Sequence, residues 1–269
     1  LEYFIANGEA YVIGCDKTLS IVNVPTEIKG VPVVGIYGAF RDSNVTKVTL
    51  PKGIKFIGEY SFQSCDYLTE VNFPESLTDI GNYAFQYCDN LKEVNFPESL
   101  TEIGEGAFYY CHSLAKVTIP GNVNRISTSA FSSCSNLEKL TIEKGVQYIE
   151  GHAFSSCSNL KEVVIAGSVR FDYYAYGIFA NCYSLEKVTF ESGITCISSE
   201  MFKNCTNLKS VNIPNTVTDI AYKAFDQCSN LKTILIPESV TYIDSNAFYV
   251  TTILVVFEDS YAHQFAERN

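Results

Sequence analysis

A phenylalanine, usually preceded by alanine, returns at a nearly fixed interval along most of this chain of 269 residues. The successive intervals are 22, 23, 23, 23, 23, 25, 23, 23 and 23 residues. Self-similarity at a period of about 20 to 50 residues indicates a repeat architecture, because so small a unit buries its apolar face only against its neighbours. We therefore expect a solenoid. The ten positions are Phe40, Phe62, Phe85, Phe108, Phe131, Phe154, Phe179, Phe202, Phe225 and Phe248.

Two more columns follow the phenylalanines at fixed spacing. A cysteine stands three residues after eight of them, and a leucine stands three residues after each cysteine. The first and last units have Ser43 and Thr251 in place of the cysteine, as expected of terminal coils with one neighbour. The cysteines are Cys65, Cys88, Cys111, Cys134, Cys157, Cys182, Cys205 and Cys228; the leucines are Leu68, Leu91, Leu114, Leu137, Leu160, Leu185, Leu208 and Leu231.

The apolar pattern inside one unit predicts its local structure. Val94 and Phe96 alternate with polar residues, which favours a strand with one buried face, and Pro97 ends that strand. Residues 100–104 are a second extended piece on the opposite side, and Phe108 lies in a compact turn. We expect one parallel sheet of about ten short strands on the concave side. They are predicted near 45–50, 68–73, 91–96, 114–119, 137–142, 160–165, 185–190, 208–213, 231–236 and 253–257.

The unit resembles a known family. Its pattern of Leu, Val, Ile or Phe, Pro, Ala-Phe and Cys is similar to that of the BspA-like bacterial surface antigens among the leucine-rich-repeat proteins, from Val45 to Phe257. The resemblance implies a mostly β solenoid with turns or 3-10 pieces between strands. It also implies a secreted or surface-displayed bacterial protein that adheres to host or extracellular-matrix proteins.

The two ends depart from the repeat. Residues 1–39 are predicted to form an N-terminal cap with a β-hairpin, because Asn7-Gly8 separates two apolar runs. Residues 40–258 are the repeats. Residues 259–269 are predicted to form a capping helix that begins after Ser260, a favoured N-cap residue.

Charge and hydropathy exclude several partners. The formal net charge of −11 argues against nucleic acid and against an anionic membrane surface, both of which attract basic proteins. The longest apolar run, residues 253–257, is far shorter than the roughly 20 residues of a membrane helix. The chain starts at Leu1 without a leader, so an extracellular location is expected from the resemblance alone.

Residue chemistry gives no sign of catalysis. Eight cysteines share one repeat position, so their side chains are expected to point the same way and to form a buried, reduced column without disulfides or metal. His112, His152 and His263 fall in different columns, and no catalytic or phosphate-binding motif occurs. The sequence predicts a protein that is not an enzyme and has no cofactor.

Polar residues that the strand pleat turns outward are the first candidate binding site. The column before the inward Val or Leu is charged, and the next outward column is rich in threonine. Opposite charges on adjacent rungs, such as Lys47 and Glu70, could instead pair with each other. The predicted binding residues are Lys116, Thr118, Lys139, Thr141, Glu162, Lys187 and Thr189.

The second candidate is the one break in the period. Two extra residues lie between Phe154 and Phe179, and this unit carries Phe171, Tyr173, Tyr174 and Tyr176. Exposed aromatic side chains bind proteins or sugars well. The alternative is that the rings fold back and fill the bulge.

These features lead to three hypotheses of function. The first is a non-enzymatic, surface-displayed scaffold that binds a host or neighbouring-cell protein and acts in adhesion. The second is a glycan-binding module that uses the aromatic residues 171–176. The third is a structural spacer.

Overall fold

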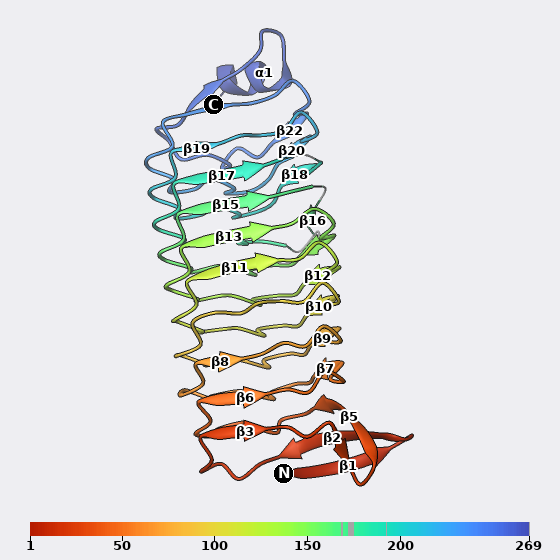
Figure 1. The fold of residues 1–269 in the computed structure, drawn as a ribbon. Coiled ribbons are helices and arrows are strands. Elements are labelled where there is room, and N and C mark those ends of the chain that lie inside the picture. Colours follow the sequence, from red (N-terminus) through yellow and green to blue (C-terminus); the bar gives the residue numbers. More distant parts are fainter. Residues whose placement is uncertain (168, 172–174, 192, 269) are drawn as a thin grey trace.

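The computed structural model describes residues 1–167, 169–171, 175–191 and 193–268. The chain winds into coils that stack in one column, with the N-terminus at one end and the C-terminus at the other (Figure 1). Most elements are short strands, and parallel pairing joins each coil to the next. The predicted repeat solenoid is confirmed.

The phenylalanine column forms the centre of the core. Phe40 through Phe225 in the repeat position are fully buried, and each ring stacks on the ring one coil away. Ring centroids lie 4.7–5.3 Å apart from Phe40 to Phe154 and 5.4–5.8 Å apart from Phe154 to Phe248. Since each ring from Phe62 to Phe225 packs against two neighbours, the coils stabilise each other along the column.

The predicted cysteine column is present and buried. Each of its eight thiols donates a hydrogen bond to the carbonyl oxygen of the phenylalanine one coil earlier, with S–O distances of 2.9–3.3 Å. All ten cysteines are free. Burial raises the pKa of Cys65 to about 11 and that of Cys228 to about 12, so these thiols are neutral and unreactive near pH 7.

The turns that carry the phenylalanines use left-handed backbone. In the coil of Phe131, Ser129 and Ser133 have φ angles of 56° and 62°. This conformation costs a residue with a side chain about 1–2 kcal/mol. It directs backbone groups along the column, and Phe131 N–H donates to Ala153 O at 2.7 Å while Ser133 N–H donates to Ser155 O at 2.8 Å. The turns therefore add their own ladder between coils.

One side of the column, here called face A, carries the strands that the sequence placed on the concave sheet. The inward Val, Leu or Ile of each strand is buried, or half-buried at Leu254, and the residue before it is exposed or half-buried. The strands of face A are β3 (Ile21–Asn23), β6 (Lys47–Thr49), β8 (Glu70–Val71), β11 (Lys116–Ile119), β13 (Lys139–Ile142), β15 (Glu162–Ile165), β17 (Lys187–Phe190), β19 (Ser210–Val211), β21 (Thr233–Leu235) and β23 (Ile253–Val255).

Face A is three sheets, in the orders β3-β6-β8, β11-β13-β15-β17-β19 and β21-β23, whereas one continuous sheet was predicted. Asparagine side chains explain two of the short strands. The Asn72 amide accepts a hydrogen bond from Leu50 N–H and donates one to Leu50 O, and Asn212 does the same to Phe190. Because an amide side chain offers the same donor and acceptor as a peptide group, it replaces the backbone ladder at that rung. The strands β8 and β19 end just before these residues.

The prediction of a strand at 91–96 is wrong. In this segment, which the structure describes in full, one isolated bridge pairs Glu93 with Lys116 and no strand forms. Its sequence, Val94-Asn95-Phe96, repeats the Val71-Asn72-Phe73 of the preceding coil. Asn95 turns its amide to Glu93 Oε1, at 3.0 Å. The sheet is therefore interrupted between β8 and β11.

The second extended piece of each unit also forms strands, which line the other side of the column, here called face B. The sequence placed these pieces correctly but did not predict that they pair, because two residues with one inward Ile give little periodicity. The strands of face B are β5 (Val31–Ile36), β7 (Phe56–Ile57), β9 (Asp79–Ile80), β10 (Glu102–Ile103), β12 (Arg125–Ile126), β14 (Tyr148–Ile149), β16 (Arg170–Phe171), β18 (Cys196–Ile197), β20 (Asp219–Ile220) and β22 (Tyr242–Ile243).

The ends close the column differently. At the N-terminus, β1 (Glu2–Ala6) and β2 (Glu9–Gly14) pair antiparallel around Asn7-Gly8, and β4 (Glu27–Ile28) pairs antiparallel with β5. Parallel pairing already begins inside residues 1–39, where β2 pairs with β5 and β3 with β6. At the C-terminus, α1 (Tyr261–Arg268) is capped by Ser260, whose Oγ accepts His263 N–H at 3.1 Å. Within the described residues, no helix is both long and apolar enough for a bilayer.

Candidate binding surface

The predicted polar residues lie together on the central sheet of face A. The backbone pairing places Lys116 beside Lys139, Lys139 beside Glu162, and Glu162 beside Lys187. Thr118, Thr141 and Thr189 occupy the next outward position of the strands β11, β13 and β17 and are half-buried. The four-residue strands hold these side chains in one array, since neighbouring strands lie about 4.8 Å apart.

Some charges on this face pair with each other. Lys47 Nζ lies 3.0 Å from Glu70 Oε1, and Lys187 Nζ lies 3.9 Å from Glu162 Oε1. Exposed pairs of this kind stabilise a fold by about 0–1 kcal/mol. For these two rungs, pairing between coils accounts for the charges without a ligand.

Two cations of the array are different. Lys116 and Lys139 are exposed neighbours, and among the described residues neither ammonium group has an ion pair or a hydrogen bond. Like charges opposite each other on adjacent strands repel, and the flanking Glu93 and Glu162 form no ion pair with either lysine. An acidic group of a partner would relieve this repulsion.

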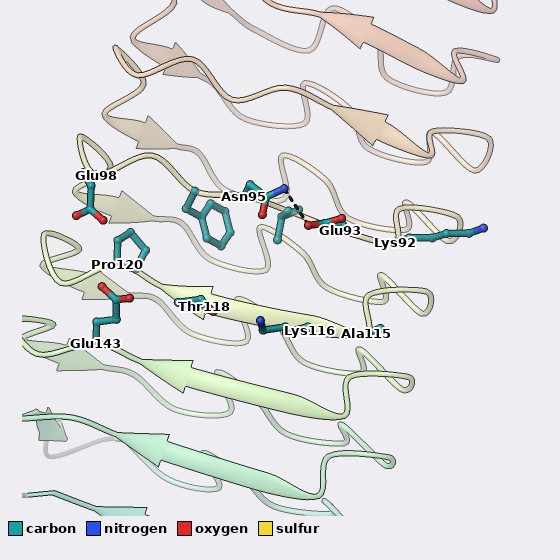
Figure 2. Close-up of a pocket in the computed structure, with 11 residues that line it drawn as sticks. Lys92, Glu93, Asn95, Glu98, Ala115, Lys116, Thr118, Pro120 and Glu143 are labelled. Carbon is teal, nitrogen blue, oxygen red and sulfur yellow. Dashed lines mark hydrogen bonds between the residues drawn. The ribbon is translucent and has the colours of Figure 1, made fainter.

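A hollow of about 440 Å³ lies beside Lys116, where the ladder of face A is interrupted. Figure 2 shows Glu98, Pro120 and Glu143 at one end of it and Lys92 and Ala115 at the other, with Lys116 and Thr118 on β11 between them. The sequence columns pointed to Lys116 and Thr118. They missed Glu98 and Glu143, which follow the strand positions in their coils, because the hollow depends on the absence of a strand at 91–96.

The described aromatic residues of the inserted unit lie in different surroundings. Phe171 lies on face B, in the inward position aligned with Ile149, and packs against the core. Tyr176 is 50% exposed, and its ring meets the His152 ring edge-on at 4.5 Å between centroids. Tyr173 and Tyr174 lie outside the described residues. The aromatic and charged parts of the predicted site therefore come from different sides of the column.

The structure brings one histidine near a serine. His112 Nδ1 lies 3.1 Å from Ser135 Oγ in the next coil. A catalytic triad also needs an acid that orients the imidazole, and no described carboxylate is hydrogen-bonded to this ring. In the part of the chain that the structure describes, no group of three or more His, Cys, Asp or Glu side chains is placed to hold a metal ion.

The chain is similar to several solved structures, and one of them supports the fold. A leucine-rich-repeat protein of T. pallidum has a TM-score of 0.62 and 29% identity, over 68% of this chain and 87% of that one. A leucine-rich cell surface protein from Faecalibacterium prausnitzii is 24% identical, with a TM-score of 0.42 over 98% of this chain and 94% of that one. The pneumococcal vaccine antigen PcpA is 17% identical, with a TM-score of 0.48 over 94% and 79% of the two chains.

No curated protein matches this sequence. The family model of the BspA-type leucine-rich-repeat region matches residues 36–161 and 124–255, which together span most of the chain. These matched residues contain the phenylalanine, cysteine and leucine columns and nearly all strands of both faces. The chain belongs to the BspA-type leucine-rich-repeat family.

Proposed function

We propose that this protein is a non-enzymatic scaffold that binds another protein through face A and is displayed on, or secreted from, a bacterial cell for adhesion. Membership of a family of repeat scaffolds supports protein binding. The T. pallidum relative shares the fold at 29% identity.

One observation favours face A as the binding surface. Lys116 and Lys139 lie side by side on β11 and β13 without an ion pair among the described residues, and Lys116 lines the hollow of about 440 Å³. A protein lying across the coils would place a carboxylate between the two ammonium groups and polar side chains in the hollow. Contacts at several rungs at once give affinity through many modest interactions around a few strong ones.

The test is binding to an array of immobilised extracellular-matrix proteins, measured by surface plasmon resonance. The double variant Lys116→Glu/Lys139→Glu should weaken binding to any matrix protein that is captured by about tenfold or more. The control Lys17→Glu/Lys52→Glu makes the same change in net charge near the N-terminal end and should leave the affinity unchanged. Equal losses in both variants would show that net charge, not face A, sets the affinity.

The other two hypotheses are separated by parallel arms of that experiment. A glycan-binding module would retain oligosaccharides and lose them with Tyr176→Ala, without any effect of the lysine variant. A structural spacer would retain neither proteins nor oligosaccharides. Either result would replace the proposal.

A further inference from the structure

Among the described residues, the strands of face B form two sheets, and the unit with the two extra residues lies between them. The sheet that begins at β1 ends at β16, and β18, β20 and β22 form a separate sheet. In regular coils the residue after the inward Ile donates its N–H to the preceding coil, as Gly104 does to Ile80 O at 2.8 Å and Ala221 to Ile197 O at 2.9 Å. Ser198 holds this position after the break. Among the described residues, its N–H has no such backbone acceptor.

A hollow of about 660 Å³ lies at this break. Its size is within the range of small-ligand sites, roughly 300–1,000 Å³. It spans from β16 across β18, β20 and β22, and so draws on four coils. The lining residues that matter here are Phe171, Ser198, Asp219, Tyr222, Tyr242 and Asp244.

Ser198 is an unpartnered polar group in this lining. The residue is 8% exposed, and its buried Oγ has no hydrogen-bond partner in the part of the chain that the structure describes. A buried hydroxyl left without a partner costs about 1–3 kcal/mol, so such groups are rare in a finished structure. A ligand that reached the floor of the hollow would provide the missing partner.

The charge of the hollow is one-sided. Asp219 Oδ2 accepts a hydrogen bond from Thr218 Oγ1, and Asp244 Oδ1 accepts one from Asn246 N–H at 2.8 Å. Among the described residues neither carboxylate has an ion pair, and the lining contains no Lys, Arg or His. Lys223 Nζ lies over the Tyr222 ring, 5.2 Å from its centre, and so covers one face of that ring without pairing with either carboxylate. Two carboxylates therefore share this space without an ion pair among the described residues.

Two tyrosines stand beside the carboxylates. Tyr222 is 44% and Tyr242 48% exposed, so part of each ring is open to a ligand. The face of an aromatic ring attracts cations, and a planar guanidinium can stack on it while its five N–H groups bind carboxylates and hydroxyls. A neutral sugar would use the rings and the hydroxyl but would leave both negative charges uncompensated.

We propose that this hollow binds a cationic group, best an arginine guanidinium, between Asp219, Asp244 and the tyrosines, with Ser198 Oγ accepting a further hydrogen bond. Its source is either a small free guanidinium compound or an arginine side chain within a peptide. The site lies on face B and does not depend on the function proposed for face A.

The experiment uses the whole chain and isothermal titration calorimetry with three probes. They are N-acetyl-arginine amide, its neutral citrulline counterpart, and the peptide Gly-Gly-Arg-Gly-Gly. We expect the arginine probes to bind and the citrulline probe to bind at least about tenfold more weakly, because a charge-assisted hydrogen bond is lost. Tighter binding of the peptide identifies an arginine in a chain as the source, and equal affinities identify a small free compound.

Matched variants locate the site. Asp219→Asn and Asp244→Asn keep the shape of the side chain and should each weaken binding of the arginine amide by about tenfold. Asp79→Asn is the control, because Asp79 holds the same repeat position on β9 and accepts the same bond from the preceding threonine, Thr78. Equal binding of citrulline, unchanged affinity in both hollow variants, or binding of a neutral oligosaccharide in place of arginine would overturn the proposal.

Discussion

The coils before and after the insertion contain the same columns but stack differently. Before it, phenylalanine rings lie 4.7–5.3 Å apart and face B is continuous; across and after it, the rings lie 5.4–5.8 Å apart and face B starts again at β18. The residue after the inward Ile differs as well. It is Gly58, Gly81 and Gly104 in the first coils, Ser127 and Glu150 in the coils just before the insertion, and Ser198, Ala221 and Asp244 in the later coils.

Glycine at this position allows the first coils to approach each other closely. A Cβ on Gly104 would lie 2.6 Å from the backbone carbon of Gly81 and 2.7 Å from Asn82 N, and one on Gly81 would lie 2.9 Å from Glu59 N. At this position the early coils touch backbone to backbone. In the later coils side chains occupy it, and the hollow of about 660 Å³ lies beside them. Ser127 and Glu150 hold this position in coils whose rings lie 5.0 and 5.3 Å apart, so the glycines account for close backbone contact between the first coils only.

The largest effect should come from the core. Phe108→Ala removes a fully buried ring stacked on two others and should lower the free energy of unfolding by about 3–5 kcal/mol. Phe248→Ala should cost less, because that ring is half-buried and stacks on Phe225 alone among the phenylalanines. Urea denaturation measures both. Equal losses would contradict stacking as the source of stability.

Substitutions at the glycine position test the comparison between the coils before and after the insertion. Gly104→Ala should destabilise the protein by about 1–3 kcal/mol, because the new methyl group meets backbone that cannot move aside. The reverse change in the later coils, Ala221→Gly, should cost about 0.5–1 kcal/mol through backbone entropy. Thermal unfolding of the two variants ranks them. If Gly104→Ala left the stability unchanged, the early coils would have space for the added methyl group.

Face A should not distinguish the two regions. Asn72→Ala and Asn212→Ala each remove two hydrogen bonds to one residue of the preceding coil, Leu50 or Phe190, and should cost about 1–2 kcal/mol in both regions. Chemical denaturation of the two variants checks this. A clear difference between them would show that the looser stacking extends across the column to face A.

The smallest of these effects on stability should come from raising the pH above neutrality. The folded pKa values of Cys65 and Cys228, about 11 and about 12, lie above the roughly 8.5 of an unfolded thiol. The folded state therefore favours the protonated thiol, and this contribution is complete below about pH 8.5 and is lost as pH rises toward 11 or 12. Unfolding measured from pH 7 to 10 should show a decline that Cys65→Ala and Cys228→Ala each make shallower. A decline unchanged in both variants would assign it to other groups.

The repeat columns were predictable because they depend on local pattern. A single inward position every 23 residues fixes which side chain is buried, so the phenylalanine and cysteine columns and the polar array of face A followed from the sequence. The ladder on face A did not, because whether Asn72 bonds to solvent or to Leu50 depends on the distance between coils.

The sequence showed where the insertion lies, but it did not predict how the insertion changes the structure. Phe171 occupies the inward position paired with Ile149, which spacing alone could not show because two residues can be inserted at several points of the coil. The hollow escaped prediction for the same reason. Asp219 looks identical to Asp79 in sequence, but the hollow beside Asp219 depends on how the coils after the insertion stack.

Hydrogen exchange at three backbone amides, followed by NMR in the free protein, tests most directly whether the insertion opens the column. Gly104 and Ala221 donate to the preceding coil, and the account predicts slow exchange at both. It predicts that the Ser198 amide exchanges at least about tenfold faster, since no described backbone acceptor protects it. Equal protection at all three amides would contradict the account, because face B would then be continuous through the insertion.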